Sequence, residues 1–344
     1  MGAESSIQWT DATWNPVRGC TVVSPGCANC YAMGVAARFS GDGQPYEGLA
    51  RFSTQRRLPQ WTGVARLVPE HLADPLRWRR PRRIFVNSMS DLFHESLTNE
   101  EIAAVFGIMA AAPQHVFQVL TKRAKRMREW FEWVSKRETG LFTERWSPRF
   151  FCFASAAEAV GGRSDGWRIG TTGLGPWPLP NVWLGVSAED QERADERIPD
   201  LLATPAAVRF VSAEPLLGPI DFEQLRGGEL LDAEGADFVN ALRGSTYWAN
   251  GDHGANVNGL DWVIVGGESG PRARPFDLDW ARSIVDQCVA AGVPVFVKQM
   301  GARPYQSVSA ASRGMGGIGL GLRSRKGDDP AEWPPELRVR EFPR

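Results

Sequence analysis

Three of the five cysteines lie on one short segment that is rich in glycine and proline. They are Cys20, Cys27 and Cys30, with the spacing C-x6-C-x2-C. Three thiolates on one loop can bind three irons of a [4Fe–4S] cluster and leave the fourth iron open. A closed cluster or a structural zinc site needs a fourth ligand, and no fourth cysteine lies nearby. The spacing therefore favours an iron–sulfur cluster with one open iron.

The rest of the composition is that of an ordinary folded protein. Cys152 and Cys288 stand alone in apolar or helical surroundings, so we predict that both are buried and unreactive. The formal net charge is -1, which excludes a protein that binds polyanions through its overall charge. No signal peptide and no apolar run long enough to span a bilayer are visible, so we expect a cytoplasmic protein without a membrane partner.

The elements that must position the cysteines alternate between strand and helix. Helices are predicted after a capping start at Thr98–Glu101, over 190–202 and over 277–291. A further strand is expected before Cys20. Six short apolar runs, rich in β-branched and aromatic residues, are typical of the strands of a covered parallel sheet. They occupy residues 83–87, 115–120, 182–186, 207–211, 262–265 and 293–297.

This alternation predicts an α/β protein built from βαβ units, with a (β/α) barrel or partial barrel over residues 1–301. Long segments interrupt the alternation at 40–82, 138–180 and 223–259. Loops of this length in a compact domain are usually functional or disordered. Residues 302–344 are predicted to form a C-terminal extension that is partly extended.

Polar residues follow the predicted strands, where the active site of a (β/α) barrel forms. Any one of them could simply cap a helix, but six polar strand ends together favour a site. Glu214 and Glu268 are the strongest candidates, because an unpaired carboxylate at the end of a buried strand is costly. The candidates are Ser88, Ser90, Asp91, Ser187, Glu189, Glu214, Gly266, Gly267, Glu268 and Lys298.

Basic and aromatic residues are interleaved in two segments, 51–83 and 122–137. Arginine binds phosphate and stacks on bases, and tryptophan offers a stacking surface, so both segments are candidates for contact with a nucleic acid. The alternative is a solvated helix face with tryptophans in the core. For 122–137 this alternative is supported as well as nucleic-acid contact. For 51–83 it is weaker, because Glu70 and Asp74 are the only acidic residues among the arginines.

Several motifs resemble those of the phage-associated three-Cys-motif family, whose function is unknown and which itself resembles radical-SAM enzymes. The similarity runs nearly end to end. The motifs are Trp14-Asn15-Pro16, Gly19-Cys20, Ser24-Pro25-Gly26-Cys27, Cys30-Tyr31-Ala32, Ser88-Met89-Ser90-Asp91-Leu92-Phe93, Thr121-Lys122-Arg123, Gly266-Gly267-Glu268-Ser269-Gly270 and the C-terminal segment 333–343.

The radical-SAM resemblance implies a (β/α)6-type partial barrel, a [4Fe–4S] cluster on the three cysteines, and S-adenosyl-L-methionine (SAM) at the open iron. The usual spacing there is C-x3-C-x2-C, and this chain has six residues in the first gap. It also implies a reductant protein such as flavodoxin or ferredoxin, and a location in a bacterial cytoplasm, or in the host cytoplasm if the protein is encoded by a phage. By position, Ser88, Ser90 and Asp91 would hold the SAM amino group. Ser187 and Glu189 would contact the ribose. Glu268, Gly266 and Gly267 would lie near the adenosine, and Glu214 is included among these cofactor contacts.

Three functions follow from these patterns. The first is a radical-SAM enzyme that generates a 5′-deoxyadenosyl radical for modification or repair of a nucleic acid, with or without a partner protein. The second is a nucleic-acid-binding protein without enzyme activity, in which the cysteines and a histidine such as His94 or His115 hold zinc. The third is a metal-independent hydrolase or lyase that uses Glu214 or Glu268 as a general base beside Lys298. No catalytic residue is assigned for the first function.

Overall fold

The computed structural model describes residues 5–55, 57–136, 147–160, 175–227, 231, 235–307 and 318–343. It has a mixed α/β fold whose largest sheet contains seven strands, in the order β1-β6-β7-β8-β9-β13-β15. The chain divides into two compact units: unit 1 is Met1–Leu184 with Thr204–Ala207, and unit 2 is Gly185–Ala203 with Val208–Arg344. Strand β8 (Val182–Ser187) contributes residues to both units.

Unit 1 contains three strands that pair in parallel, namely β1 (Ala12–Trp14), β6 (Arg83–Val86) and β7 (Val116–Thr121). Ala12 lies opposite Ile84, and Ile84 lies opposite Phe117. All three side chains are fully buried, as expected where both faces of a parallel sheet are covered. The predicted strands at 83–87 and 115–120 are confirmed, as is a strand before Cys20.

Helix α3 (Asn99–Ala111) begins where the sequence predicts. The Thr98 hydroxyl accepts a hydrogen bond from the Glu101 backbone N–H at 3.1 Å. In return, the Glu101 carboxylate accepts one from the Thr98 backbone N–H at 2.8 Å. This reciprocal capping box satisfies two of the backbone donors that a helix start leaves free.

The burial of α3 differs from that of a helix with one apolar face, because residues 102–110 are all buried. Helix α5 (Pro148–Ala159) covers the second side. The two helices approach so closely that a Cβ on Gly107 would lie 2.1 Å from the Cys152 carbonyl oxygen. The described part of the predicted insertion 138–180 therefore includes a helix, and Cys152 is buried in it as predicted.

Short elements fill the rest of unit 1. Helix α4 (Ala124–Ser135) follows β7. Two antiparallel pairs form between β2 (Val17–Arg18) and β5 (Arg66–Leu67), and between β3 (Ala50–Phe52) and β4 (Pro59–Trp61). The remaining turns and helices are η1 (Pro25–Cys27), α1 (Tyr31–Arg38), α2 (Pro69–Leu72) and η2 (Asp74–Arg77).

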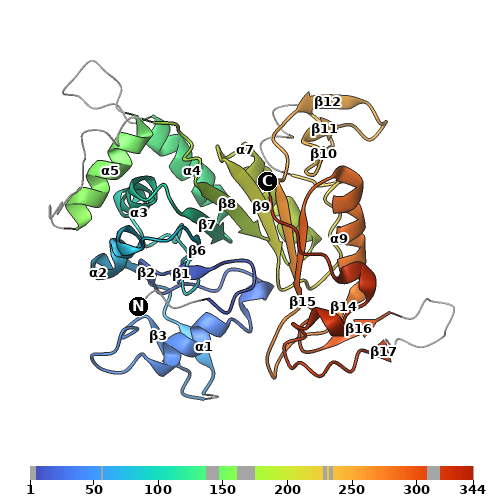
Figure 1. The fold of residues 1–344 in the computed structure, drawn as a ribbon, viewed down its shortest axis with the longest axis horizontal. Helices are drawn as coiled ribbons and strands as arrows, with labels where there is room; N and C mark the ends of the chain where they lie inside the picture. The colour runs from blue at the N-terminus through green and yellow to red at the C-terminus, as the bar shows by residue number, and fades with distance from the viewer. Residues whose placement is uncertain are drawn as a thin grey trace. The chain divides into compact units, whose positions relative to one another are not determined.

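Unit 2 is built on β9 (Val208–Ala213), β13 (Trp262–Gly266) and β15 (Val295–Gln299). Strand β13 lies between the other two and is parallel to both. Helix α7 (Gln191–Ala203) follows β8, and α9 (Leu278–Ala291) packs along β13 and β15 (Figure 1). These strands and helices confirm the pattern predicted over 182–297.

The end of the chain runs along β15, an edge strand of the sheet. The Val297 backbone N–H donates to the Val339 carbonyl at 2.9 Å, and the Glu341 N–H donates to the Val295 carbonyl at 3.0 Å. The Trp262 indole N–H also donates to the Glu341 carbonyl at 2.8 Å. The extended tail thus satisfies backbone groups that an edge strand would otherwise expose.

Two small sheets complete unit 2. Strands β10 (Phe238–Asn240), β11 (Ser245–Tyr247) and β12 (His253–Asn256) form an antiparallel sheet within the predicted insertion 223–259. The other contains β14 (Phe276–Asp277), β16 (Pro304–Gln306) and β17 (Ile318–Gly319). Two 3-10 turns follow, η3 (Pro330–Glu332) and η4 (Pro335–Leu337).

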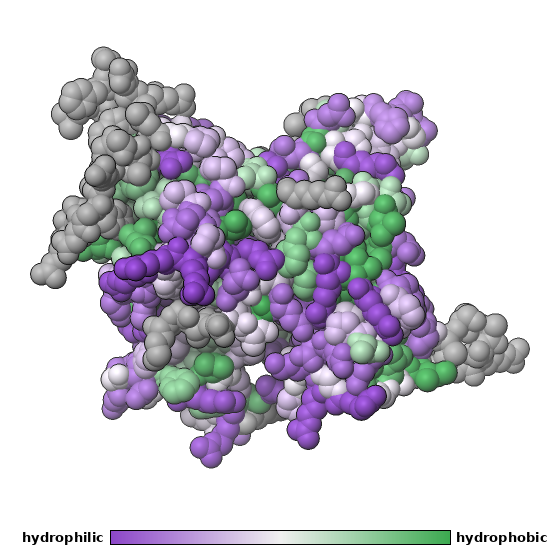
Figure 2. All heavy atoms as spheres, viewed as in Figure 1, coloured by the Kyte–Doolittle hydropathy of each residue, from purple (hydrophilic) through white to green (hydrophobic). Residues whose placement is uncertain are grey.

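The surface is largely hydrophilic on the face shown in Figure 2, with smaller groups of hydrophobic residues between. Among the helices of the described segments, none is both long enough and apolar enough to cross a bilayer.

Candidate functional site

The segment of unit 1 that carries the three cysteines, residues 14–32, is called the cysteine loop, and its conformation depends on a glycine and two turns. Gly19 has a φ of +92°, and a Cβ there would lie 2.1 Å from the Val64 carbonyl oxygen, so only glycine fits. The Cys27 N–H donates to the Ser24 carbonyl at 3.0 Å, and the Cys30 N–H donates to the Cys27 carbonyl at 3.2 Å. Cys30 is also the N-cap of α1. All three cysteines are free thiols of intermediate exposure.

The electrostatic surroundings of the three thiols bear on metal binding. The pKa of the Cys20 thiol is raised to about 12, mainly by burial and also by the charge of Asp91, and the guanidinium of Arg123 opposes this rise. Burial also raises the pKa of the Cys30 thiol, while hydrogen bonds from the backbone N–H groups of Met33 and Ala32 oppose it. A bound cation favours the thiolate over the thiol, so a metal ion would reverse the effect of burial.

The cysteines are neighbours without forming a closed ligand set. Cys27 is close enough to Cys20 and to Cys30 to raise the pKa of each through its charge. Across the described residues, no three His, Cys, Asp or Glu side chains are gathered around one point in a way that would hold a metal ion. The donor set itself fits an iron–sulfur cluster, because thiolates are the ligands that irons of such clusters take.

The chain leaving β6 is bonded to the cysteine loop. The Ser90 hydroxyl donates to the Val17 carbonyl at 2.9 Å, and Ser90 forms a parallel bridge with Gly19. The Ser88 hydroxyl donates to the Asn15 side chain at 3.2 Å, and its carbonyl accepts from the Tyr31 hydroxyl at 2.7 Å. The structure therefore brings Ser88 and Ser90 beside the cysteine loop, and their contact with the amino group of SAM stays a prediction.

Asp91 is the most heavily bonded of the predicted site residues. Its carboxylate accepts hydrogen bonds from the Phe93 N–H, the Thr121 hydroxyl, the Lys122 N–H and the Arg123 guanidinium, at 2.7–3.1 Å. The Asp91 and Arg123 side chains are both buried. This carboxylate joins the ends of β6 and β7, and its contact with the amino group of a ligand stays a prediction.

Arg123 was predicted only as part of a motif and of the basic segment 122–137, and the structure gives it a place near Cys20. Its Nη1 bonds Asp91 at 3.0 Å, and its Nε bonds the Glu95 carboxylate at 2.8 Å. Its Nη2 is buried and has no hydrogen-bond partner among the described residues. A buried guanidinium donor near Cys20 with no acceptor is a group that an anionic ligand could satisfy.

His94 was a candidate zinc ligand, and both of its ring nitrogens are occupied. Nδ1 accepts from the Ser96 N–H at 3.1 Å, and Nε2 lies 2.6 Å from the Thr21 hydroxyl. Burial lowers the pKa of His94, and the charge of Arg123 lowers it further, so the ring is held neutral. His115 is also buried, with Nε2 3.2 Å from the Pro75 carbonyl.

Ser187 is the last residue of β8, Glu189 lies two residues later, and both belong to unit 2. The Arg197 guanidinium donates to the Ser187 carbonyl at 2.8 Å and to the Glu189 carboxylate at 3.0 Å. Glu189 and Arg197 are 0% and 2% exposed, so their ion pair is internal. Sequence reasoning missed Arg197, although its place on the helix after Glu189 was a usable signal. A contact of Ser187 or Glu189 with a ribose stays a prediction.

Glu268 is paired with Arg274, six residues later. The guanidinium donates to both carboxylate oxygens, at 2.6 and 3.0 Å, and the Arg274 backbone N–H donates to one of them at 2.9 Å. The preceding Gly267 is required by a close approach, because a Cβ there would lie 2.4 Å from the Met300 carbonyl oxygen. The glycines thus serve strand packing, and Glu268 forms a bidentate ion pair.

Glu214, Lys298 and Gly266 come together at the ends of β9, β15 and β13. The Lys298 ammonium lies 2.6 Å from Glu214 Oε1. A Cβ on Gly266 would lie 3.3 Å from the Glu214 Cδ, so the carboxylate lies directly over this glycine. These three residues are therefore neighbours within unit 2, and Glu214 rather than Glu268 is the partner of Lys298.

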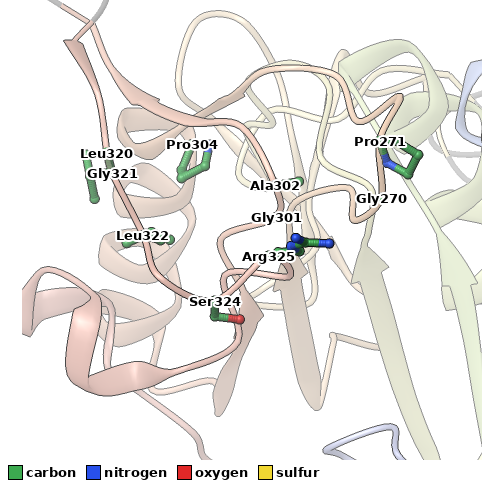
Figure 3. A pocket seen from close by; sticks show the side chains of 10 residues that line it. All are labelled: Gly270, Pro271, Gly301, Ala302, Pro304, Leu320, Gly321, Leu322, Ser324 and Arg325. Atoms are coloured by element: carbon green, nitrogen blue, oxygen red, sulfur yellow. The ribbon is translucent and has the colours of Figure 1, made fainter.

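A separate hollow of about 520 Å³ lies elsewhere in unit 2 (Figure 3). Its lining is small and apolar, apart from Ser324 and Arg325. Gly270 is the one lining residue that comes from the predicted glycine-rich motif. The lining residues are Gly270, Pro271, Gly301, Ala302, Pro304, Leu320, Gly321, Leu322, Ser324 and Arg325.

The two basic segments differ in what their tryptophans do. Trp130 of 122–137 is fully buried and stacks on Phe106 with ring centroids 4.5 Å apart, so it is a core residue. Trp78 of 51–83 is only partly buried, and the Arg82 guanidinium lies 5.2 Å from its ring centroid. Exposed arginines surround it in sequence at Arg77, Arg79 and Arg80. Arg56 and Arg137 lie outside the described residues.

Comparisons with known proteins give a family and no activity. The family model described as "Protein of unknown function (DUF5131)" matches residues 4–324. No curated protein and no solved structure matches the chain.

Proposed function

The chain belongs to DUF5131, a protein family of unknown function, and from this premise we propose that it is an iron–sulfur enzyme of the radical-SAM type. Cys20, Cys27 and Cys30 would bind three irons of a [4Fe–4S] cluster, and SAM would bind at the fourth. Such a cluster supplies one electron for cleavage of SAM, the source of a 5′-deoxyadenosyl radical. The radical-SAM resemblance and the phage association of the motifs both stay predictions.

The observation that carries the proposal is the set of donors around the thiols. The backbone N–H groups of Met33 and Ala32 at the start of α1 act to lower the pKa of the Cys30 thiol, against the effect of burial, and the helix dipole there also favours negative charge. Near Cys20 lies the buried Arg123, whose Nη2 has no hydrogen-bond partner among the described residues. Hydrogen bonds and positive charge around thiolate ligands stabilise them and tune a cluster.

The residues after β6 hold the cysteine loop in place through hydrogen bonds. Ser88 and Ser90 fix its position through Asn15 and Val17. Asp91 holds Arg123 in its buried place beside Cys20.

A nucleic acid is the proposed substrate. The support is Trp78 with Arg82 against its ring and the exposed Arg77, Arg79 and Arg80. Arginine bound to phosphate releases counterions, so affinity for DNA or RNA should fall steeply as salt rises. Filter binding at several salt concentrations tests this, and a flat salt dependence would remove the nucleic acid from the proposal. A protein reductant and a cytoplasmic location stay predictions.

The first experiment is anaerobic reconstitution with iron and sulfide. The wild-type protein should take up about four irons per chain and, once reduced, give an electron paramagnetic resonance signal that changes when SAM is added. Cys27→Ala should lose iron binding and SAM cleavage together. Cys152→Ala is the matched control, because Cys152 is buried in α5 outside the loop, and it should keep both.

Two other outcomes would select the alternatives. A colourless protein with one tightly bound zinc that is lost in Cys27→Ala would favour the nucleic-acid-binding protein. The occupied nitrogens of His94 weigh against that histidine as the fourth ligand. A protein that binds neither iron nor zinc would favour the third alternative, a metal-independent hydrolase or lyase. The ion pair between Glu214 and Lys298 supports that alternative.

A further inference from the structure

The ends of three neighbouring strands in unit 2 create an unusual place for an ion pair. Val265 of β13 lies opposite Val297 of β15, but the next residue, Gly266, lies opposite Gln299. Lys298 is therefore the extra residue of a bulge, and a bulge redirects a side chain out of the regular ladder. On the other side of β13, Val265 lies opposite Ala213, so Glu214 follows directly at the same end of the sheet.

Gly266 lies directly beneath the ion pair of Glu214 and Lys298. A Cβ at this position would lie 3.3 Å from both Cγ and Cδ of Glu214 and 3.4 Å from Oε1. The absence of a side chain on the central strand lets the flanking Glu214 and Lys298 meet across it, with Nζ 2.6 Å from Oε1. The neighbouring Gln299 side chain lies 3.4 Å from the same oxygen and donates to the Gly267 carbonyl at 2.8 Å.

The bonding capacity of this pair is only partly used. Glu214 Oε2 accepts no hydrogen bond from the described residues. The Lys298 ammonium has three N–H groups but donates only one hydrogen bond to the described residues. The two side chains are 17% and 19% exposed, so solvent or a ligand can reach them. By contrast, both oxygens of Glu268 are occupied by Arg274.

We propose that Glu214 and Lys298 form a recognition site for the ammonium and carboxylate of an α-amino acid. Such a group carries the two opposite charges side by side, as the site does. Its ammonium would bond Glu214 and its carboxylate would bond Lys298 and Gln299. The single internal ion pair would be replaced by two intermolecular pairs, and the site would stay electrically neutral.

Ligands with one charge fit less well. A simple cation would approach Glu214 but would be repelled by Lys298, and a simple anion would meet the reverse repulsion. In a half-buried place a charge left without its partner is costly, so a zwitterion is favoured over either. The inference does not depend on the iron–sulfur chemistry, because all of the groups belong to unit 2.

The test begins with the wild-type full chain and a mixture of the twenty L-α-amino acids, observed by saturation-transfer nuclear magnetic resonance. At least one amino acid should show transfer. The matching amine without the carboxylate, and the matching acid without the ammonium, should each bind about tenfold or more weakly. Absence of transfer to every amino acid, or equal binding of either analogue, would overturn the proposal.

Variants then locate the site. Glu214→Gln and Lys298→Met should each weaken binding of that amino acid by about tenfold or more. Glu336→Gln is the control, because it breaks an ion pair with Arg282 in the same unit, where the side chains are 28% and 50% exposed, and it should bind as wild type does. Unchanged affinity in both site variants would refute the assignment. Should a variant fail to fold, the analogue series on the wild-type chain decides.

Discussion

Replacing Asp91 with alanine is the sharpest test of how the cysteine loop is supported. The carboxylate accepts four hydrogen bonds, from Phe93, Thr121, Lys122 and Arg123. Asp91→Ala removes all four acceptors at once. It also leaves the Arg123 guanidinium buried with only Glu95, whose side chain is 64% exposed, as a charged partner.

The size of the effect follows from the burial of the pair. The Asp91 and Arg123 side chains are 8% and 5% exposed, and removing one partner of a buried ion pair destabilises a protein by about 3–5 kcal/mol. A folded domain is stable by only about 5–15 kcal/mol, so unit 1 should lose a large part of its stability. Unit 2 contains none of these contacts and should be unaffected.

Hydrogen exchange read by mass spectrometry separates the two units, which a single unfolding curve would not. Backbone amides of β6 and β7 in Asp91→Ala should exchange faster by about two to four orders of magnitude, since each ~1.4 kcal/mol is a factor of ten. Glu189→Ala is the reciprocal control, because Glu189 forms a buried pair with Arg197 in unit 2. It should speed exchange in β9 and leave β6 unchanged.

Less than about tenfold faster exchange at β6 and β7 would refute this reasoning. It would mean that the four bonds add little to the native state. Asp91 would then be better regarded as a carboxylate held for a ligand than as a support for Arg123.

Three further substitutions test single contacts. Gly267→Ala places a Cβ 2.4 Å from the Met300 carbonyl oxygen and should speed hydrogen exchange in β13 and β15, whereas unchanged exchange would show that β13 can move away. Gly34→Ala in α1 meets nothing within 4 Å and should stabilise the helix by about 0.5–1 kcal/mol, seen as a higher midpoint in urea. Thr98→Ala removes the bond that Glu101 donates to it and should cost about 1 kcal/mol, with Thr98→Ser as the control that keeps the cap.

Much of the fold is visible in the sequence because its signals are local. Each apolar run that predicts a strand is a few residues long, and the cap of α3 is set by Thr98 and Glu101 alone. The three cysteines are close in the sequence, so a shared loop was predicted, whereas the hydrogen bonds of Ser88 and Ser90 to that segment are seen only in the structure.

The burial of α3 on all sides could not be predicted from the sequence. Its apolar residues predict one buried face, and nothing near them indicates that α5 covers the other. The close approach depends on Gly107 meeting Cys152, a contact between segments far apart in the chain. Likewise, the sequence left open whether Trp130 stacks on a base or packs in the core, and its contact with Phe106 decides for the core.

The sequence by itself determined the main parallel strands, three of the helices, the cysteine loop and the polar residues at the strand ends, but not α5 or the small sheet of β10, β11 and β12. The tertiary structure decided which of those polar residues pair with one another. Asp91 meets Arg123 across 32 residues, and Glu214 meets Lys298 across 84. Such pairings depend on strand register and on a bulge at Lys298, which are set by the packing of the whole sheet rather than by neighbouring residues.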